Sequence, residues 1–247
     1  EEGPTEAFFK DQYTRLGKKI YNFVASNLPA KPLQGKFVLE VGCGAGGILK
    51  YFKDQGCSVK GIDLGSQYIE YGKTIHGLDL EVMPIEKLQL AQKPDIIIYS
   101  HVLEHILDLK SQLSKIQSLM HNDTILYIEV PGLKNLHQSY NGDLLLYLQN
   151  AHVYHFTKTS LLNLMRSNGF ESICIDEFVR SVFQKSTSKQ ETNSNTSEYP
   201  GIIKYLRRIE WVRKISPVPP YLFRFYLKRG AYNILSFFKV VPPLSKK

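Results

Sequence analysis

The sequence predicts an α/β fold with a mostly parallel sheet, and three observations support this prediction. Short apolar runs that suit buried strands alternate with segments whose apolar residues recur at helical spacing. A glycine-rich stretch, residues 42–47, follows the first apolar run and precedes a helical pattern. Asp63 ends the second apolar run, 21 positions after Gly42. Strands that alternate with helices are usually parallel neighbours joined by crossovers.

Each element is assigned from its own stretch of sequence. The expected strands are Phe37–Val41, Ser58–Asp63, Leu80–Met83, Ile96–Tyr99, Asp123–Val130, Phe170–Asp176 and Phe178–Phe183. The expected helices are 5–28, a helix that starts at Gly47, Ser66–Ile75, Leu107–Met120 and Thr157–Gly169. Prolines at 29 and 32 end the first helix, and Thr157 and Gly169 suit the two ends of the last one.

The glycine-rich stretch and Asp63 together indicate a ligand that carries a nucleoside. Glycines let the backbone turn tightly and approach a ligand, and the helix that follows offers free N–H groups. A carboxylate at the position of Asp63 suits the hydroxyls of a ribose. The dinucleotide fingerprint G-x-G-x-x-G does not fit, because residues 40–46 read E-x-G-x-G-x-G.

Glu40-Val-Gly-Cys-Gly-Ala-Gly46 resembles the first motif of class I S-adenosylmethionine (SAM)-dependent methyltransferases. Asp63 matches their ribose-binding acid, and Asp95–His105 resembles their fourth strand with its following loop. The resemblance extends over about residues 36–183. It implies a Rossmann-like, seven-stranded, mostly parallel sheet with helices on both faces, whose last two strands form an antiparallel pair. It also implies SAM as the cofactor and S-adenosylhomocysteine as its product.

The resemblance assigns cofactor contacts to individual residues. Gly42 and Gly44 let the backbone pass beneath the cofactor, and Glu40 orients the loop and the methionine amino end. The implied contacts are Glu40, Gly42, Cys43, Gly44, Gly46, Asp63, Leu64, Ile85, Glu86, Ser100 and His101. In related enzymes the first helix covers the cofactor, so Tyr13 or Arg15 is a further candidate, against a plain packing role for either residue.

A general base suits a hydroxyl acceptor, and histidine is the usual base near neutral pH. His155 is the first candidate and His105 the second, with His152 and Glu129 behind them, and each has a structural hydrogen-bonding role as the alternative. The segment that starts at His152 resembles a run found in methyltransferases that act on sugars and polysaccharides. His101–His105 also fits the H-x-x-E-H zinc pattern, but the pair straddles a strand exit, so no metal is expected.

Charge and cysteine content separate the C-terminal part from the rest. Residues 201–247 carry 11 Lys and Arg and one acidic residue, while the whole chain has a net charge of +8. Three cysteines without a C-x-x-C pair favour a reducing compartment. No apolar run approaches the ~18 residues of a spanning helix. A cytoplasmic protein is expected, with peripheral contact at the inner membrane face as an extension.

Four segments follow from these patterns. They are an N-terminal helical cap (1–35), a SAM-binding domain (36–184), a polar linker or lid (185–200) and a basic, aromatic helical appendage (201–247). The appendage suits an anionic membrane surface. Packing on the core or on a second subunit, as in a homodimer, is the alternative, and nucleic acid is disfavoured.

Three functions are weighed. The first is methyl transfer to a hydroxyl of a sugar, on a nucleotide-sugar or a surface glycan, which would place the chain in polysaccharide biosynthesis. The second is O-methylation of a lipid-soluble phenol or quinone. The third is a scaffold that does not catalyse and acts through its basic tail.

Overall fold

The computed structural model describes residues 3–28, 32–136, 140, 144–148, 150–186, 197–215 and 227. The chain forms two compact units. The first contains residues 1–132 and 153–193, and the second contains residues 133–152 and 194–247.

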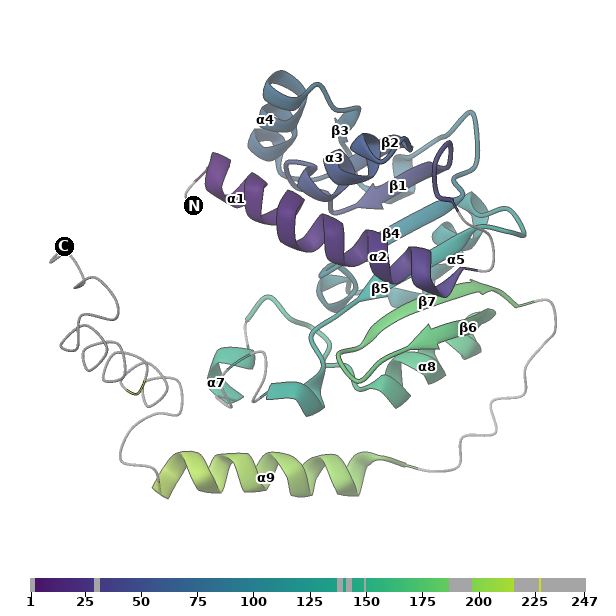
Figure 1. Cartoon of the computed structure of the whole chain (residues 1–247). Coiled ribbons are helices and arrows are strands. Elements are labelled where there is room, and N and C mark those ends of the chain that lie inside the picture. The colour runs from purple at the N-terminus through teal and green to yellow at the C-terminus, as the bar shows by residue number, and fades with distance from the viewer. Residues whose placement is uncertain are drawn as a thin grey trace, which may run out of the picture. The chain divides into compact units, whose positions relative to one another are not determined.

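The first unit is built on a seven-stranded sheet with the order β3-β2-β1-β4-β5-β7-β6 (Figure 1). The strands are β1 (Phe37–Val41), β2 (Ser58–Asp63), β3 (Leu80–Val82), β4 (Ile96–Ser100), β5 (Ile125–Glu129), β6 (Phe170–Ile175) and β7 (Arg180–Lys185). The first five strands run parallel, whereas β7 is antiparallel to both β5 and β6. The predicted strand number and the antiparallel final pair are confirmed.

The last strand begins later than expected because a tight turn precedes it. The Asp176 carboxylate accepts hydrogen bonds from the backbone N–H groups of Phe178 (2.9 Å) and Arg180 (3.1 Å). Val179 inside this turn has φ 58°, a left-handed conformation that a strand cannot contain. Phe178 and Val179, the first two residues of the predicted strand, therefore belong to the turn.

Helices cover both faces of the sheet. They are α1 (Glu6–Asp11), the π-helical segment η1 (Gln12–Gly17), α2 (Lys18–Asn27), α3 (Gly47–Asp54), α4 (Ser66–His76), α5 (Leu109–Leu119) and α8 (Lys158–Ser167), with 3₁₀ turns η2 (Ile85–Lys87) and η3 (Leu103–His105). The predicted first helix is continuous from α1 through η1 to α2 and lies across the sheet (Figure 1). Its π-helical middle was not predicted.

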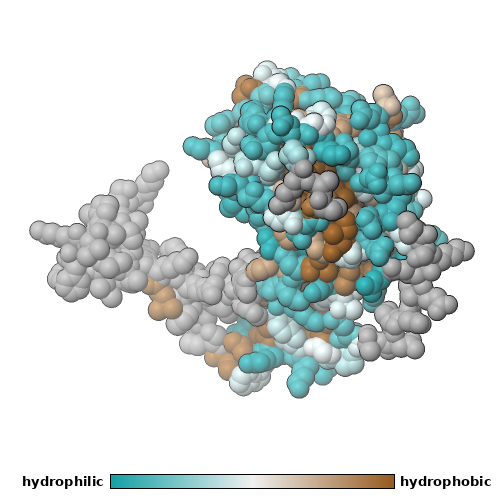
Figure 2. Space-filling model, turned by 45° about the vertical axis from the view of Figure 1, so that its right-hand side comes forward, coloured by the Kyte–Doolittle hydropathy of each residue, from teal (hydrophilic) through white to brown (hydrophobic). Residues whose placement is uncertain are grey.

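Two apolar clusters, one on each face of the sheet, form the core. Strand β4 shows the arrangement, because Ile96 and Ile98 pack with the N-terminal helices while Ile97 and Tyr99 pack with α5 and α8. Successive side chains of a strand point to opposite faces, so a continuous apolar run is what a doubly covered strand requires. The surface around this core is mostly hydrophilic on the face drawn in Figure 2.

The second unit joins the segment after β5 to the C-terminal helix. It contains η4 (Leu133–Asn135), α7 (Leu144–Tyr147) and α9 (Tyr199–Ile215). Leu133, Leu136 and Tyr147 are buried together, and Ile202, Tyr205, Leu206 and Ile209 of α9 pack against them. The Tyr205 hydroxyl donates to the Lys134 carbonyl at 3.2 Å.

Helix α9 begins at Tyr199, slightly before the predicted start of the appendage at residue 201. Most of the predicted linker, and the helical patterns expected beyond residue 220 apart from Leu227, lie outside the described residues. Within the described part of the chain, no helix is long and apolar enough to cross a membrane.

Candidate active site

The glycine loop, residues 42–47, connects β1 to α3 and has a backbone that side chains would disrupt. Gly42, Gly44 and Gly46 have φ values of 72°, 53° and 80°. This left-handed region costs little only for glycine. A Cβ added to Gly42 would also overlap a methyl group of Val102, so the loop has no room there for a larger residue.

The Asp63 carboxylate holds the glycine loop against the end of β2. One oxygen accepts from the backbone N–H of Gly44 at 2.8 Å, and the other accepts from that of Gly65 at 2.7 Å. Because β1 and β2 are parallel neighbours, their carboxyl ends bring the loop and the acid to the same edge of the sheet.

A pocket of about 360 Å³ opens at this edge, and we call it the edge pocket. Six residues predicted from sequence line it: Gly42, Asp63, Leu64, Ile85, Glu86 and His105. The remaining lining residues are Val41, Ile62, Met83, Pro84, Val102, Ile106 and Gln112. Gln112 was not predicted, because nothing in the sequence distinguishes it from the other polar residues of an amphipathic helix. Its side-chain amide donates a hydrogen bond to the Tyr99 hydroxyl at 3.0 Å.

Glu40 is buried beneath the glycine loop, in the last part of β1. Burial and the nearby charge of Asp63 raise the pKa of this carboxyl well above its usual value, and only the hydrogen bond from the Leu49 N–H opposes them. Its Oε2 has no hydrogen-bond partner among the described residues. A buried acceptor of this kind suits a positively charged donor from a ligand.

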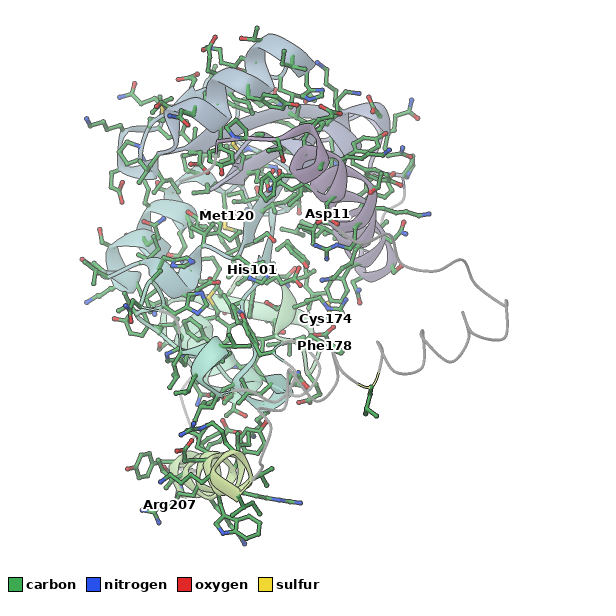
Figure 3. The ribbon with its side chains drawn as sticks, turned by 90° about the vertical axis from the view of Figure 1, so that its left-hand side faces the viewer. Asp11, His101, Met120, Cys174, Phe178 and Arg207 are labelled. Atoms are coloured by element: carbon green, nitrogen blue, oxygen red, sulfur yellow. The ribbon has the colours of Figure 1, made fainter. Side chains whose placement is uncertain are left out.

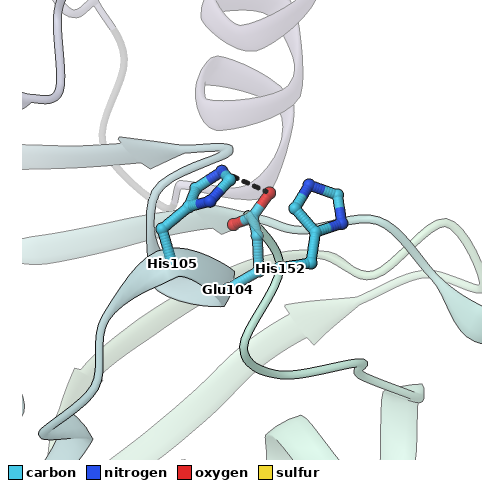
Figure 4. A group of neighbouring side chains, drawn as sticks. All are labelled: Glu104, His105 and His152. Carbon is cyan, nitrogen blue, oxygen red and sulfur yellow. Dashed lines mark ion pairs between the residues drawn. The ribbon is translucent and has the colours of Figure 1, made fainter. Parts of the chain in front are cut away.

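Glu104 lies between two histidines in the turn after β4. Its side chain is 1% exposed, and Oε1 lies 3.5 Å from His101 Nδ1. The same oxygen lies 3.9 Å from His105 Nε2, a pair that Figure 4 shows. Burial lowers the pKa of His101, but the adjacent carboxylate of Glu104 and the charge of Glu129 outweigh it and raise the pKa overall. The sequence shows this acid inside H-x-x-E-H, where only a zinc role was considered.

The left-handed backbone of His101 turns the chain sharply out of β4. Its φ is 57°, and its N–H donates to the Glu129 carbonyl at 2.9 Å. The residue lies near the middle of the view in Figure 3. Neither His101 nor the preceding Ser100, which is half-buried at the end of β4, is among the lining residues of the edge pocket.

His155 lies in a segment that is attached to the same turn. The N–H groups of Val153 and Tyr154 donate to the Glu104 carbonyl at 2.9 and 3.1 Å, and the Tyr154 hydroxyl donates to the Leu107 carbonyl at 3.1 Å. Burial lowers the pKa of His155, which is not among the lining residues of the edge pocket. His152, also drawn in Figure 4, belongs to the second unit.

Three other candidates are engaged elsewhere. Glu129 is buried, with Lys19 Nζ 2.5 Å from one carboxylate oxygen and the Tyr127 hydroxyl 2.8 Å from the other. The Tyr13 hydroxyl donates to Asp54 at 3.0 Å, and Arg15 binds Asp11 through two nitrogens at 2.8 and 2.7 Å. The side chains of Tyr13 and Arg15 are therefore bound to other partners.

The two remaining predicted residues, Cys43 and Gly46, belong to the glycine loop and are not among the lining residues of the edge pocket. Cys43 is buried, and its Sγ lies 2.7 Å from where a Cβ on Gly61 would stand. Gly46 is the residue before α3, and its left-handed conformation starts that helix.

The family model described as a methyltransferase domain matches residues 10–175. A ubiquinone biosynthesis O-methyltransferase of Haemophilus ducreyi is 30% identical over 122 residues, which are 44% of this chain and 50% of the relative. A malonyl-[acyl-carrier protein] O-methyltransferase of Enterobacter lignolyticus is 30% identical over 92 residues, 37% of this chain and 36% of the relative. The chain thus spans at most about half the length of these curated relatives.

Solved structures share the fold at low sequence identity. A SAM-dependent methyltransferase from Clostridium acetobutylicum superposes with a TM-score of 0.55 at 11% identity, covering 73% of this chain and 97% of its own. A Burkholderia thailandensis 1,6-didemethyltoxoflavin-N1-methyltransferase, crystallised with its substrate and S-adenosylhomocysteine, gives 0.54 at 16% identity, covering 73% and 81%. At these identities the likeness concerns the fold.

Proposed function

Because the chain belongs to the methyltransferase-domain family, as its motifs predicted, we propose that it transfers a methyl group from SAM to an acceptor oxygen. The observation that carries this proposal is the edge pocket, in which Asp63, Ile85 and Glu86 come together beside the glycine loop. Oxygen is proposed as the acceptor atom because the curated relatives are named O-methyltransferases.

The residues around the glycine loop fit SAM. The surroundings of Gly44 are open, because a Cβ added there would meet only Gln12 Nε2, at 3.7 Å. Glu40 Oε2 is a buried acceptor without a hydrogen-bond partner among the described residues. Asp63 would bind the ribose hydroxyls, Leu64, Ile85 and Glu86 would bind the adenine, and Glu40 would bind the amino group. When bound, SAM supplies a sulfonium-activated methyl group, and the protein supplies alignment and any proton removal.

His105 is the proposed general base, ahead of His155. It lines the edge pocket and is 38% exposed, while the buried carboxylate of Glu104 lies next to its imidazole. A carboxylate beside a histidine orients the ring and stabilises the imidazolium that forms when the ring takes a proton. The proton would come from the acceptor hydroxyl.

An apolar phenol, or a quinone that carries a hydroxyl group, is the proposed acceptor, and a sugar hydroxyl is the second candidate. Leu64 on the pocket wall is 73% exposed, and Leu107, next to the pocket residue Ile106, is 78% exposed. Val153 and Tyr154, which bind the turn containing Glu104, are also exposed. Exposed apolar side chains that gather near a pocket favour an apolar ligand.

The test is transfer of a radiolabelled methyl group from SAM to a lipophilic catechol and, separately, to nucleotide-sugars. We expect labelling of the catechol, and a loss of about 10²-fold or more in His105→Gln. The matched control is His121→Gln, because His121 lies outside the edge pocket. Labelling of the sugars alone would establish the second candidate, and equal rates in both histidine variants would remove His105 as the base.

The basic appendage is proposed to bind an anionic membrane surface. Lys204, Arg207 and Arg208 are exposed on α9 together with Trp211 (61% exposed), and Figure 3 shows Arg207 on this helix. Basic residues beside an exposed tryptophan suit the interface of a bilayer with anionic lipids. Equal partition of the full chain and of Trp211→Ala/Arg207→Ala/Arg208→Ala onto phosphatidylglycerol vesicles would contradict this role.

A non-catalytic scaffold is the competing function. It would require the edge pocket not to bind SAM, although the glycine loop, Asp63 and Glu40 are all present. The methyl-transfer assay, together with calorimetric titration with S-adenosylhomocysteine, decides between the two functions.

A further inference from the structure

Gln12, the first residue of the π-helical segment η1, lies directly against the glycine loop. A Cβ added to Gly47 would stand 2.6 Å from Gln12 Cβ and 3.2 Å from its Oε1. A Cβ added to Gly44 would stand 3.7 Å from Gln12 Nε2. The carboxamide of Gln12 is therefore in contact with two glycines of the loop.

The Gln12 Oε1 atom is buried and has no hydrogen-bond partner among the described residues. A buried acceptor that lost its water and gained no donor costs free energy, so native proteins rarely retain one without a reason. A second buried acceptor without a partner, Glu40 Oε2, belongs to the strand that leads into the same loop. Two such acceptors at one loop indicate a ligand with several donors.

The N-terminal helix packs closely against α3 and the glycine loop, which brings Gln12 to the loop. Gly17 allows this helix to approach α3, because a Cβ there would stand 2.6 Å from Tyr51 Cβ. Gly47 allows the same at the loop, where a Cβ would stand 2.8 Å from the Phe9 carbonyl oxygen. Near the start of the helix, Phe9 stacks on His76 of α4 with ring centroids 3.5 Å apart.

The π-helical geometry of η1 is a second sign of function. Such segments are rare and are frequently found at functional sites, because the wider turn changes the direction of a side chain. Tyr13 and Arg15 of the same segment bind Asp54 and Asp11, so their side chains are committed elsewhere. Gln12 is left directed at the glycine loop.

We propose that Gln12 binds the amino acid end of SAM, with its Oε1 accepting a hydrogen bond from the cofactor ammonium group. An ammonium carries three donors and no acceptor, which suits both Gln12 Oε1 and the Glu40 carboxylate. The sequence did not suggest Gln12, because a polar residue in an amphipathic helix usually faces solvent. This inference rests on the proposed function, since it assumes that SAM binds at the glycine loop.

The test is calorimetric titration with two ligands, S-adenosylhomocysteine and 5′-methylthioadenosine. The second ligand retains the adenosine and the sulfur but lacks the amino acid end. Gln12→Met keeps the length of the side chain and removes the acceptor. We expect Gln12→Met to bind S-adenosylhomocysteine about tenfold more weakly or worse, with the binding of 5′-methylthioadenosine unchanged.

Gln55→Met is the matched control, because Gln55 is exposed at the end of α3 and is absent from the edge pocket. It should bind both ligands as the unmodified protein does. Equal binding of S-adenosylhomocysteine by Gln12→Met and the unmodified protein would overturn the assignment, as would an equal loss of both ligands. No binding by the unmodified protein would overturn the proposed function along with this inference.

Discussion

Among single residues, three glutamates stand out because the fold buries their carboxylates. Glu40, Glu104 and Glu129 are each at most 6% exposed, and each lies at or just beyond the carboxyl end of a parallel strand. Burial disfavours a charged group unless it has a partner. Glu129 forms an ion pair with Lys19, and Glu104 lies within 4 Å of two histidines. Within the described part of the chain, Glu40 has only the Leu49 N–H as a partner.

Glu40→Gln should raise thermal stability at alkaline pH and weaken cofactor binding. The folded pKa of Glu40 is raised, so its contribution to stability is present below the unfolded value of 4.5 and is lost as the pH rises through the folded pKa. Melting at pH 5 and pH 8 measures this, and each kcal/mol gained should raise Tm by about 2–4 °C. If Glu40→Gln changed Tm by the same amount at pH 5 and at pH 8, the pKa of Glu40 would not be raised in the folded protein.

Glu104→Gln should lower the pKa of His101. The raised pKa means that the pair stabilises the fold below the unfolded pKa of His101, near 6.5, and that this contribution disappears as the pH rises through the folded value. NMR titration of the imidazole signals measures the change. His76 of α4 provides the internal control, because burial lowers its pKa and Glu104 is not among the causes. An unchanged pKa of His101 in Glu104→Gln would show that Glu104 does not raise this pKa.

At the scale of elements, the site depends on how closely the N-terminal helix approaches α3. Gly17 and Gly47 stand where the two helices meet, and a Cβ at either position would require atoms to move. The helical stripe was predicted from its apolar spacing. The π-helical segment was not, because the spacing of apolar residues does not distinguish it from an α-helix.

Gly47→Ala should destabilise the fold by about 1–3 kcal/mol, because the added methyl group overlaps Gln12 Cβ and the Phe9 carbonyl. Gly201→Ala in α9 is the control: a Cβ there meets nothing within 4 Å, so we expect a gain of up to about 1 kcal/mol. Urea unfolding of both variants measures the difference. A stable Gly47→Ala protein would show that the helix can move away from the loop at little cost.

Sequence patterns specified the elements better than the details of the site. Strands and helices were predictable because a doubly covered parallel sheet requires apolar runs such as Ile96–Tyr99. Gly42, Asp63, Leu64, Ile85 and Glu86, which were predicted as cofactor contacts, all line the edge pocket, because each lies at or just beyond the carboxyl end of a parallel strand. The role of Gln12 depends on a contact between segments that are far apart in the sequence, and that of Glu104 on the turn that brings its buried carboxylate beside His101 and His105. His155, preferred over His105 from sequence, is absent from the pocket lining.

At the scale of the whole molecule, the two units divide the proposed functions. Every residue that lines the edge pocket belongs to the first unit, whereas the basic helix α9 belongs to the second. The apolar residues of α9 that are packed, among them Ile202 and Leu206, contact the cluster around Tyr147 within the second unit. Cofactor binding and surface binding should therefore be separable.

Removal of residues 197–247 should leave binding of S-adenosylhomocysteine within about twofold of that of the full chain, because the deletion removes no pocket residue. It should also expose Leu133, Leu136 and Tyr147 and reduce solubility. Calorimetry on the truncated chain measures the first effect, with circular dichroism to show that it is folded. A folded truncated chain that no longer binds would show that the second unit contributes to the cofactor site.

If the glycine loop and Asp63 form a SAM site, calorimetric titration should detect binding of S-adenosylhomocysteine. The unmodified protein should bind at one site, and Asp63→Ala should bind about a hundredfold more weakly, because two hydrogen bonds to a charged acceptor are lost. Asp79→Ala, at an exposed aspartate, should bind normally. Absence of binding by the unmodified protein, or equal binding by all three proteins, would show that the glycine loop and Asp63 do not form a SAM site.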